Sequence, residues 1–516
     1  MISLPAVFSD DMVLQQNKPI EIWGKTDAGS LHLSFHDIVM EIAVENGKFR
    51  TFIPEQQAGG PYVLKIWSEQ ERLVFDNVMV GEVWIAGGQS NMELELVNSL
   101  HGEDIVKHIE NPMVRFYYTP KISWVGEELL DAERNSKWEL CSPDTAGRWS
   151  AVGYYYASEL ARSLNVVVGV IGCNWGGTSA SCWTSMESLK NNPAIASYAE
   201  EYEERTAGLN EDSYIKEWKD YLIYQAEFDK KVGYYYQTAE NPNWDEAIRL
   251  FGESRYPGPM GPRNFTRPGG LYESMLSRIC PYTVSGVIFY QGEEDDHKPY
   301  SYKELLTTMI HTWREDWHDK SLPFLLVQLP VFLGEQDEDG MNWPFIREAQ
   351  MDVSRTVPQV KMATILDLGE KRNIHPLNKQ TVGERLAKIA LSEIYRKPDV
   401  TDIYGPVYSG FELKANQMIL SFDYAEEGFV CTSDTVNGFE IAGDDKIYYP
   451  ADAHFAGQYI IIESSKVEEP KYARYGWANY FDVNLFGRNL LPVAPFRTDR
   501  DDGAKAVSGR NGLAQD

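Results

Sequence analysis

Ser90, which follows two glycines and is flanked by Gln89 and Asn91, is the residue of this sequence best suited to nucleophilic chemistry. Residues 87–92 read Gly-Gly-Gln-Ser-Asn-Met and follow the apolar run 83–86, which predicts a buried parallel strand. A serine hydroxyl is a good nucleophile only when it is exposed and a base removes its proton. Glycines before Ser90 allow the sharp turn that exposes it. Alternatively, Ser90 only caps a helix, a position where serine is common.

One of the nine histidines follows a predicted strand. The strand 362–366 ends at Asp367, and the loop after it contains His375 and Pro376. Because the parallel strands of an α/β sheet end at one edge, this loop should lie beside Ser90. His375 is therefore the candidate general base. The alternative is a surface histidine stiffened by Pro376.

Two further strand ends offer donors for the negative charge that develops on an ester oxygen during attack. Gly176 and Gly177 follow the run 166–171 and present backbone N–H groups, and Gln291 follows the strand 287–290 and presents a side-chain amide. Alternatively, either feature is a tight turn without a catalytic role.

The segment 293–297 reads Glu-Glu-Asp-Asp-His and suggests other chemistry. Carboxylates with a histidine bind divalent ions, and paired carboxylates hydrolyse glycosidic bonds. Neighbouring residues of a loop point in different directions, so we interpret the segment as a charged loop at the mouth of the site. Glu293 and the nearby Trp175 are expected to contact the substrate. The predicted mechanism uses no metal and no other cofactor.

The elements that must position these residues alternate along the middle of the chain. Helical patterns over 154–164, 302–313 and 382–395 separate the strands, which predicts a mostly parallel, doubly wound α/β sheet. Period-two alternation predicts a β module on each side of it. We expect a β-sandwich-like module over 1–80, the α/β domain over 81–400 with a helical insertion at about 200–265, a β module over 401–499, and a flexible tail over 500–516.

Composition excludes several classes of protein. Lys plus Arg is 48 and Asp plus Glu is 77, giving a net charge of −29, which argues against nucleic acid and anionic membranes as partners. The five cysteines are scattered without a CxxC pair, so neither a zinc ribbon nor a disulfide framework is expected. The sequence shows no signal-peptide pattern and no apolar run of about 18 residues. We expect a cytoplasmic protein.

Four ordered motifs, together with both flanks of the chain, resemble the sialate O-acetylesterase-like proteins of the SGNH hydrolase superfamily. The motifs are Gly-Gly-Gln-Ser-Asn-Met at 87–92, Trp-Gly-Gly-Thr at 175–178, Tyr-Gln-Gly-Glu at 290–293 and Asn-Ile-His-Pro-Leu-Asn-Lys at 373–379. The flanks are Phe-Ser-Asp-Asp-Met-Val-Leu-Gln at 8–15 and Pro-Phe-Arg-Thr-Asp at 495–499. The resemblance covers nearly the whole chain up to about Asp499.

The resemblance implies a three-layer α/β/α, flavodoxin-like core with Ser90 as nucleophile and His375 as base. It also implies a backbone oxyanion donor at Gly176 or Gly177, next to the N–H of Ser90. Gln291 stands where other members of the superfamily carry an asparagine oxyanion donor.

The sequence departs from the superfamily at the acid that orients the histidine. An aspartate often stands three residues before that histidine, but the position is Arg372 here. Asp367 and Glu370 are the candidates for this role. A backbone carbonyl is equally possible and would leave a Ser–His dyad.

The activity implied by the resemblance is removal of O-acetyl groups from carbohydrates, such as xylan fragments or sialic acids. The alternatives are a carbohydrate-binding protein with an inactive hydrolase core, or a glycosidase using Glu293. The predicted sheet edge is rich in aromatic and acidic residues, so we expect neutral oligosaccharides to be preferred. A sialic acid would need a cation for its carboxylate, for which Arg263 and Arg267 are the candidates.

Overall fold

The computed structural model describes residues 1–239, 244–334 and 340–500. The predicted tail therefore lies outside the described residues, except for Arg500. Within the described part of the chain, no helix is long and apolar enough to cross a membrane. All five cysteines are free.

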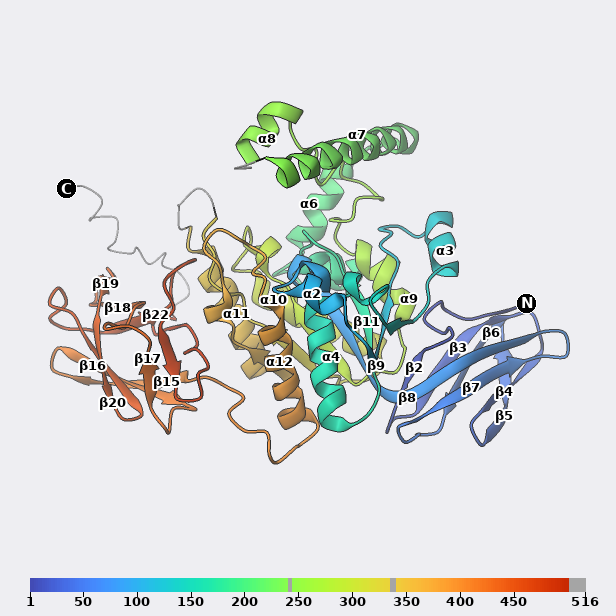
Figure 1. The fold of residues 1–516 in the computed structure, drawn as a ribbon. Helices are drawn as coiled ribbons and strands as arrows, with labels where there is room; N and C mark the ends of the chain where they lie inside the picture. Colours follow the sequence, from blue (N-terminus) through green and yellow to red (C-terminus); the bar gives the residue numbers. More distant parts are fainter. Residues whose placement is uncertain (240–243, 335–339, 501–516) are drawn as a thin grey trace.

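A sheet of parallel strands runs through the middle of the molecule (Figure 1). In spatial order its strands are β9 (Asn111–Tyr118), β11 (Val168–Asn174), β8 (Arg72–Gly88), β12 (Gly286–Tyr290), β13 (Phe324–Val327) and β14 (Val360–Ala363). The short β10 (Glu139–Cys141) pairs antiparallel with β9 at one edge. Strands β11, β12 and β13 are buried along their whole length, which explains their apolar sequences.

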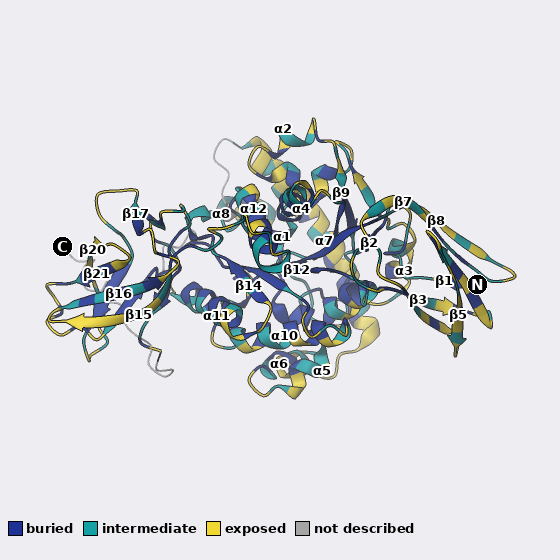
Figure 2. Ribbon diagram, turned by 90° about the horizontal axis from the view of Figure 1, so that it is seen from below, coloured by how far each residue is buried: buried dark blue, intermediate teal, exposed yellow. Residues whose placement is uncertain are grey.

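Helices cover both faces of this sheet (Figure 2). On one face lie α4 (Ala151–Leu164) and α12 (Lys379–Ile389), and on the other lie α10 (Tyr302–Asp316) and α11 (Asn342–Thr356). The first two begin at side-chain caps, because Ser150 accepts the Gly153 N–H and Asn378 accepts the Thr381 N–H. The predicted three-layer α/β/α core is confirmed.

The strand register brings three chain segments to one edge of the sheet. In the central strand β8, Gly88 lies beside Asn174 of β11 and Tyr290 of β12. The segments that begin at Ser90, Gly176 and Gln291 therefore leave the sheet side by side, at the carboxyl edge where α/β folds place ligands.

The N-terminal module is built from antiparallel pairs that continue into the central sheet. Its strands are β1 (Ile2–Ser3), β3 (Ile20–Thr26), β4 (Ser30–Phe35), β5 (Ile38–Glu45), β6 (Lys48–Ile53) and β7 (Gly59–Trp67). The first part of β8 pairs antiparallel with β7, and its last residues are parallel to β11 and β12. The short β2 (Val13–Gln15) also pairs with β8. The boundary predicted near residue 80 therefore falls inside one continuous strand.

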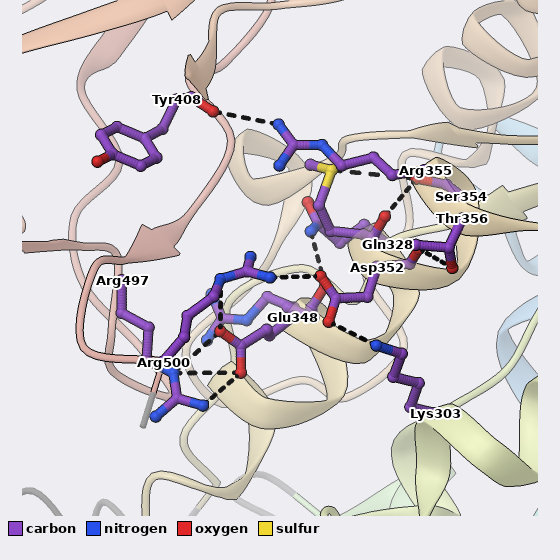
Figure 3. A network of polar contacts seen from close by, with 12 residues as sticks. Lys303, Gln328, Glu348, Asp352, Ser354, Arg355, Thr356, Tyr408, Arg497 and Arg500 are labelled. Atoms are coloured by element: carbon purple, nitrogen blue, oxygen red, sulfur yellow. Dashed lines mark hydrogen bonds and ion pairs between the residues drawn. The ribbon is translucent and has the colours of Figure 1, made fainter. Parts of the chain in front are cut away.

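The C-terminal part is rich in β structure, as predicted. Its strands are β15 (Val407–Lys414), β16 (Gln417–Asp423), β17 (Phe429–Cys431), β18 (Phe439–Ala442), β19 (Tyr449–Pro450), β20 (Asp452–Ala456), β21 (Tyr459–Glu463), β22 (Tyr472–Tyr475), β23 (Leu485–Gly487) and β24 (Phe496–Arg497). Arg497 holds it to α11 through a two-pronged contact with Glu348, at 2.9 and 2.8 Å (Figure 3). Asp352, one turn further along, accepts from Lys303 at 3.1 Å and from Arg500 at 2.9 Å.

A helical arm stands above the carboxyl edge of the sheet (Figure 1). It consists of α6 (Ser197–Thr206), α7 (Glu211–Thr238) and α8 (Trp244–Phe251). Tyr214, Trp218 and Tyr221 of α7 are buried and pack as a small separate cluster. The remaining short helices are α1 (Ser90–Glu93), α2 (Gly102–Val106), α3 (Glu127–Arg134), α5 (Met186–Asn191) and α9 (Ser277–Ile279).

Candidate functional site

Ser90 stands at the first position of α1, immediately after the central strand. Gly88 has a φ of +133°, and a Cβ there would lie 2.1 Å from the carbonyl oxygen of Tyr290. Only glycine fits this close approach of β8 to β12. The Gln89 N–H then donates to the same carbonyl at 3.1 Å, which fixes the turn and leaves Ser90 half-buried.

The structure brings His375 into contact with Ser90. The distance from His375 Nε2 to Ser90 Oγ is 2.8 Å, a normal hydrogen bond. The loop that carries His375 follows β14. Within this loop, the Asn373 side chain accepts the backbone N–H of His375 at 3.0 Å. Pro376 is buried, so the loop is held at both sides of the imidazole. The two residues have the geometry of a nucleophile and its base.

The acid predicted to orient His375 is engaged elsewhere. Both carboxylate oxygens of Asp367 accept from the Arg385 guanidinium, at 2.7 and 2.6 Å, so Asp367 anchors α12 instead. Glu370 accepts the Leu377 N–H at 3.0 Å and thereby closes the loop. Within the described part of the chain, Ser90 is the hydrogen-bond partner found for the His375 ring. This arrangement corrects the prediction for Asp367 and corresponds to the dyad alternative.

Of the two glycines predicted as oxyanion donors, Gly177 is the one with an available N–H. The Gly176 N–H donates to the carboxylate of Glu93. Among the described residues, the N–H groups of Gly177 and Ser90 have no hydrogen-bond acceptor. A Cβ on Gly176 would lie 3.2 Å from the Ser90 Cβ, so this loop passes directly beside the serine.

Gln291 does not supply the predicted side-chain donor. Its amide nitrogen donates to the Asp295 carboxylate at 2.5 Å and to the Thr178 carbonyl at 3.2 Å, and its oxygen accepts from Tyr302 at 2.9 Å. Both N–H bonds are therefore used, and the side chain is buried. The Gln291 amide is occupied because Asp295 is a fully buried carboxylate that accepts hydrogen bonds from several donors.

Asp295 ties the glycine loop to the end of β12. Besides Gln291, it accepts from the Ser179 hydroxyl at 2.6 Å, the Ala180 N–H at 2.9 Å and the Tyr198 hydroxyl at 3.2 Å. Burial raises the pKa of this carboxyl, while the hydrogen bonds oppose the shift. The acidic segment is thus not a uniformly solvated loop, because Glu293 and Asp295 are buried while Glu294 and His297 are exposed.

Glu293 is buried against Asn91, the residue after Ser90, instead of facing a substrate. This corrects its predicted role in substrate binding. Glu293 is 5% exposed and accepts from the Asn91 amide at 2.5 Å. The same amide donates to the Ile374 carbonyl at 2.9 Å, and the Asn91 oxygen accepts from Lys379. Burial raises the pKa of Glu293 and lowers that of Lys379 to about 7. Asn91 therefore connects the serine turn to the residue before His375.

We expect Asn91→Ala to reduce kcat by about 10- to 100-fold with little change in KM, because a displaced base disturbs the reacting geometry. The melting temperature should also fall, since Glu293 and Lys379 lose their bridging partner. The measurement is kcat and KM on an aryl ester together with thermal unfolding. Asn98→Ala is the matched control, because Asn98 is exposed and bonds only to Glu95. Equal kcat in the two variants would contradict the positioning role.

The pKa of His375 lies below its ordinary value of about 6.5. Burial is the main cause, the positive charge of Lys379 adds to it, and Glu93 opposes it. The neutral imidazole that a general base requires is therefore retained to lower pH than in an exposed histidine.

Activity should accordingly fall on the acid side with a midpoint below about pH 6.5. Glu93→Gln should move the midpoint further down, because it removes the negative charge that favours the protonated ring. Its amide oxygen still accepts the Gly176 N–H. The measurement is kcat/KM for an aryl acetate from about pH 4.5 to 8. An upward shift in Glu93→Gln would refute this account of the His375 pKa.

Aromatic rings pack beside the glycine loop that follows β11. The Trp175 ring stacks on Phe265 with ring centroids 5.1 Å apart and an angle of 9° between the rings, and Tyr256 packs on Phe265 at 5.6 Å. The two cations considered for a sialic acid are both engaged. Arg263 lies 3.6 Å from Glu128, and Arg267 pairs with Glu273 at 2.5 Å.

Comparisons with known proteins agree with this architecture. A family model described as carbohydrate esterase, sialic acid-specific acetylesterase, matches residues 260–392. Sialate O-acetylesterase of Mus musculus is 26% identical over 500 residues, covering 89% of this chain and 85% of the relative. The Homo sapiens protein of that name is 24% identical over 456 residues, covering 81% of this chain and 76% of the relative.

A crystal structure of a carbohydrate acetylesterase from Xanthomonas citri superposes with a TM-score of 0.77. It is 29% identical and covers 97% of this chain and 100% of that one. The chain is similar in sequence to sialate O-acetylesterases and similar in fold to a carbohydrate acetylesterase. The predicted resemblance is thereby confirmed over nearly the whole length, both β modules included.

Sequence reasoning missed several residues at this site. Asn91 and Lys379 stand inside the motifs that contain Ser90 and His375. Their place in these motifs could have identified them as site residues. Tyr256 and Phe265 come from the loop after the helical arm and belong to no motif. In residues 1–239, 244–334 and 340–500, no cluster of three His, Cys, Asp or Glu side chains could hold a metal.

Proposed function

We propose that this chain is a serine esterase that removes O-acetyl groups from carbohydrates. The observation that supports it best is the 2.8 Å contact between Ser90 Oγ and His375 Nε2. It lies beside the N–H groups of Ser90 and Gly177, which have no acceptor in the described part of the chain. The names of the relatives point to the same reaction class.

The first half of the reaction forms an acetyl-serine. Ser90 Oγ attacks the acetyl carbon while its proton passes to Nε2 of His375, and the carbonyl π electrons move to the oxygen. The N–H groups of Ser90 and Gly177 donate to that oxyanion. When the carbonyl re-forms, the bond to the sugar oxygen breaks, and His375 returns the proton to that oxygen.

The second half regenerates the serine. His375 takes a proton from water, whose oxygen attacks the acetyl carbon, and the resulting intermediate expels Ser90 Oγ. The same proton then passes from His375 to Ser90, and acetate leaves. Both proton transfers use Ser90 and His375, which are already in hydrogen-bond contact, and this argues against an inactive hydrolase core.

The glycosidase alternative has less support. A glycosidase needs two carboxyl groups that face the sugar. Glu293 is buried against Asn91 and Asp295 is buried against Gln291, so neither faces an open site.

For the substrate, we favour neutral acetylated oligosaccharides over sialic acids. Arg263 and Arg267 contact carboxylates of this chain, and the net charge of −29 disfavours an anionic sugar at long range. The test is kcat/KM for acetylated xylo-oligosaccharides and for 9-O-acetylated sialic acid in one low-salt buffer. A clear preference for the sialate, weakened by replacing Arg263 or Arg267, would refute this choice.

A further inference from the structure

The hydroxyl of Tyr256 lies against the candidate oxyanion loop. A Cβ built on Gly177 would come within 1.8 Å of Tyr256 Oη, so the hydroxyl occupies the space that a larger residue would need. Gly177 also has a φ of +67°, where glycine is favoured. Tyr256 as a whole residue is 52% exposed, while its hydroxyl lies against Gly177.

This hydroxyl has no hydrogen-bond partner among the described residues, unlike several tyrosines nearby. Tyr198 donates to Asp295, Tyr302 to Gln291, and Tyr214 accepts the Arg263 N–H. Burial raises the pKa of Tyr256, and Glu294 adds to the shift. The hydroxyl therefore remains protonated and available as a donor at neutral pH.

The helical arm holds Tyr256 in this place. A Cβ on Gly258 would lie 2.6 Å from the Tyr221 ring of α7, so the tyrosine packs closely on the loop. Tyr224 of α7 bonds to the Glu253 carbonyl at 2.7 Å, and Arg255 stacks on its ring at 3.8 Å. The far side of Tyr256 packs on Phe265. Side chains of the arm thus fix the loop on both sides of Tyr256.

Among the described residues, the other candidate donors for the oxyanion are backbone N–H groups. Gln291, the side-chain donor expected from its position after β12, has both N–H bonds occupied. The N–H groups of Ser90 and Gly177 are available, and the Tyr256 hydroxyl lies beside the second of them.

We propose that Tyr256 is a catalytic residue whose hydroxyl donates a hydrogen bond to the oxyanion formed at the acetyl carbonyl, alongside the N–H groups of Ser90 and Gly177. This proposal rests on the proposed esterase function. It gives the helical arm a role in the chemistry, because side chains of α7 position the loop that carries this donor.

The test compares wild type with Tyr256→Phe, which keeps the ring and its packing. Two substrates are used, 4-nitrophenyl acetate and an acetylated xylo-oligosaccharide, and phenylboronic acid serves as an inhibitor that forms a tetrahedral anion on a serine. We expect kcat/KM to fall about 100-fold for both substrates, the usual effect of removing one oxyanion donor. The Ki of the boronic acid should rise by a similar factor. Tyr234→Phe, on the exposed face of α7, should match wild type within twofold.

Three results would overturn the role of Tyr256. They are activity of Tyr256→Phe within twofold of wild type, a loss confined to the oligosaccharide, or an unchanged Ki for the boronic acid. The proposed function is judged separately, by whether wild-type turnover disappears in Ser90→Ala. A wild type without Ser90-dependent turnover refutes the esterase function itself, whereas normal turnover in Tyr256→Phe refutes only the donor.

Discussion

Ser90→Ala should lose about 10⁴-fold or more of the wild-type kcat on an aryl acetate while its melting temperature stays close to wild type. The loss follows because no acetyl-enzyme can form without Oγ, and the residual rate reflects the remaining oxyanion donors alone. Stability should change little, since Ser90 is half-buried and its hydroxyl bonds to His375 alone among the described residues. The measurement is kcat together with thermal unfolding.

The matched control for this variant is Ser163→Ala. Ser163 lies near the end of α4, just before β11 begins, and therefore at the opposite edge of the sheet. Mass spectrometry of rapidly quenched wild type should show one acetyl group on the peptide that contains Ser90, and none in Ser90→Ala. Substantial aryl acetate turnover by Ser90→Ala would exclude the serine as nucleophile.

Much of the core could be predicted because buried parallel strands have a strong local signature. The apolar runs before Ser90, Gly176 and Gln291 indicated strands, and the shared edge of such strands indicated that the polar residues after them meet. That topology places the loop with His375 at the same edge as Ser90, where the two side chains are in contact. The continuous β8 was harder to foresee, because its two halves differ in pattern and read as separate elements.

Side-chain partners could not be predicted, since they depend on which groups burial brings together. Gln291 stands at the expected place, yet the buried Asp295 occupies its amide. Asp367 follows the expected strand, yet Arg385 occupies both its oxygens. In both cases the side chain makes a hydrogen bond with a nearby charged group, and such bonds are strong. Tyr256 lies in the loop after the inserted helices. The helical pattern of this insertion does not indicate where that loop packs in the folded protein.

His375→Ala should reduce kcat by about 10³- to 10⁴-fold, because Ser90 then has no base and the sugar oxygen has no proton donor. The double variant Ser90→Ala, His375→Ala should be no slower than the slower single variant, since the two side chains act as a unit. Asp367→Asn is the contrasting control. It should lower stability by weakening the contact with Arg385 but keep kcat within about tenfold of wild type.

These three outcomes together distinguish a dyad from a triad. In a triad, changing the orienting acid to its amide costs orders of magnitude in kcat because the imidazole adopts the wrong tautomer. Here the bonds shown act on the loop backbone: the Asn373 side chain accepts the backbone N–H of His375, and the Asn91 amide donates to the Ile374 carbonyl. A loss in Asp367→Asn as large as that in His375→Ala, without loss of folding, would show that Asp367 moves to the imidazole during the reaction. Kinetic additivity of Ser90→Ala and His375→Ala would show instead that the two residues do not act on the same proton.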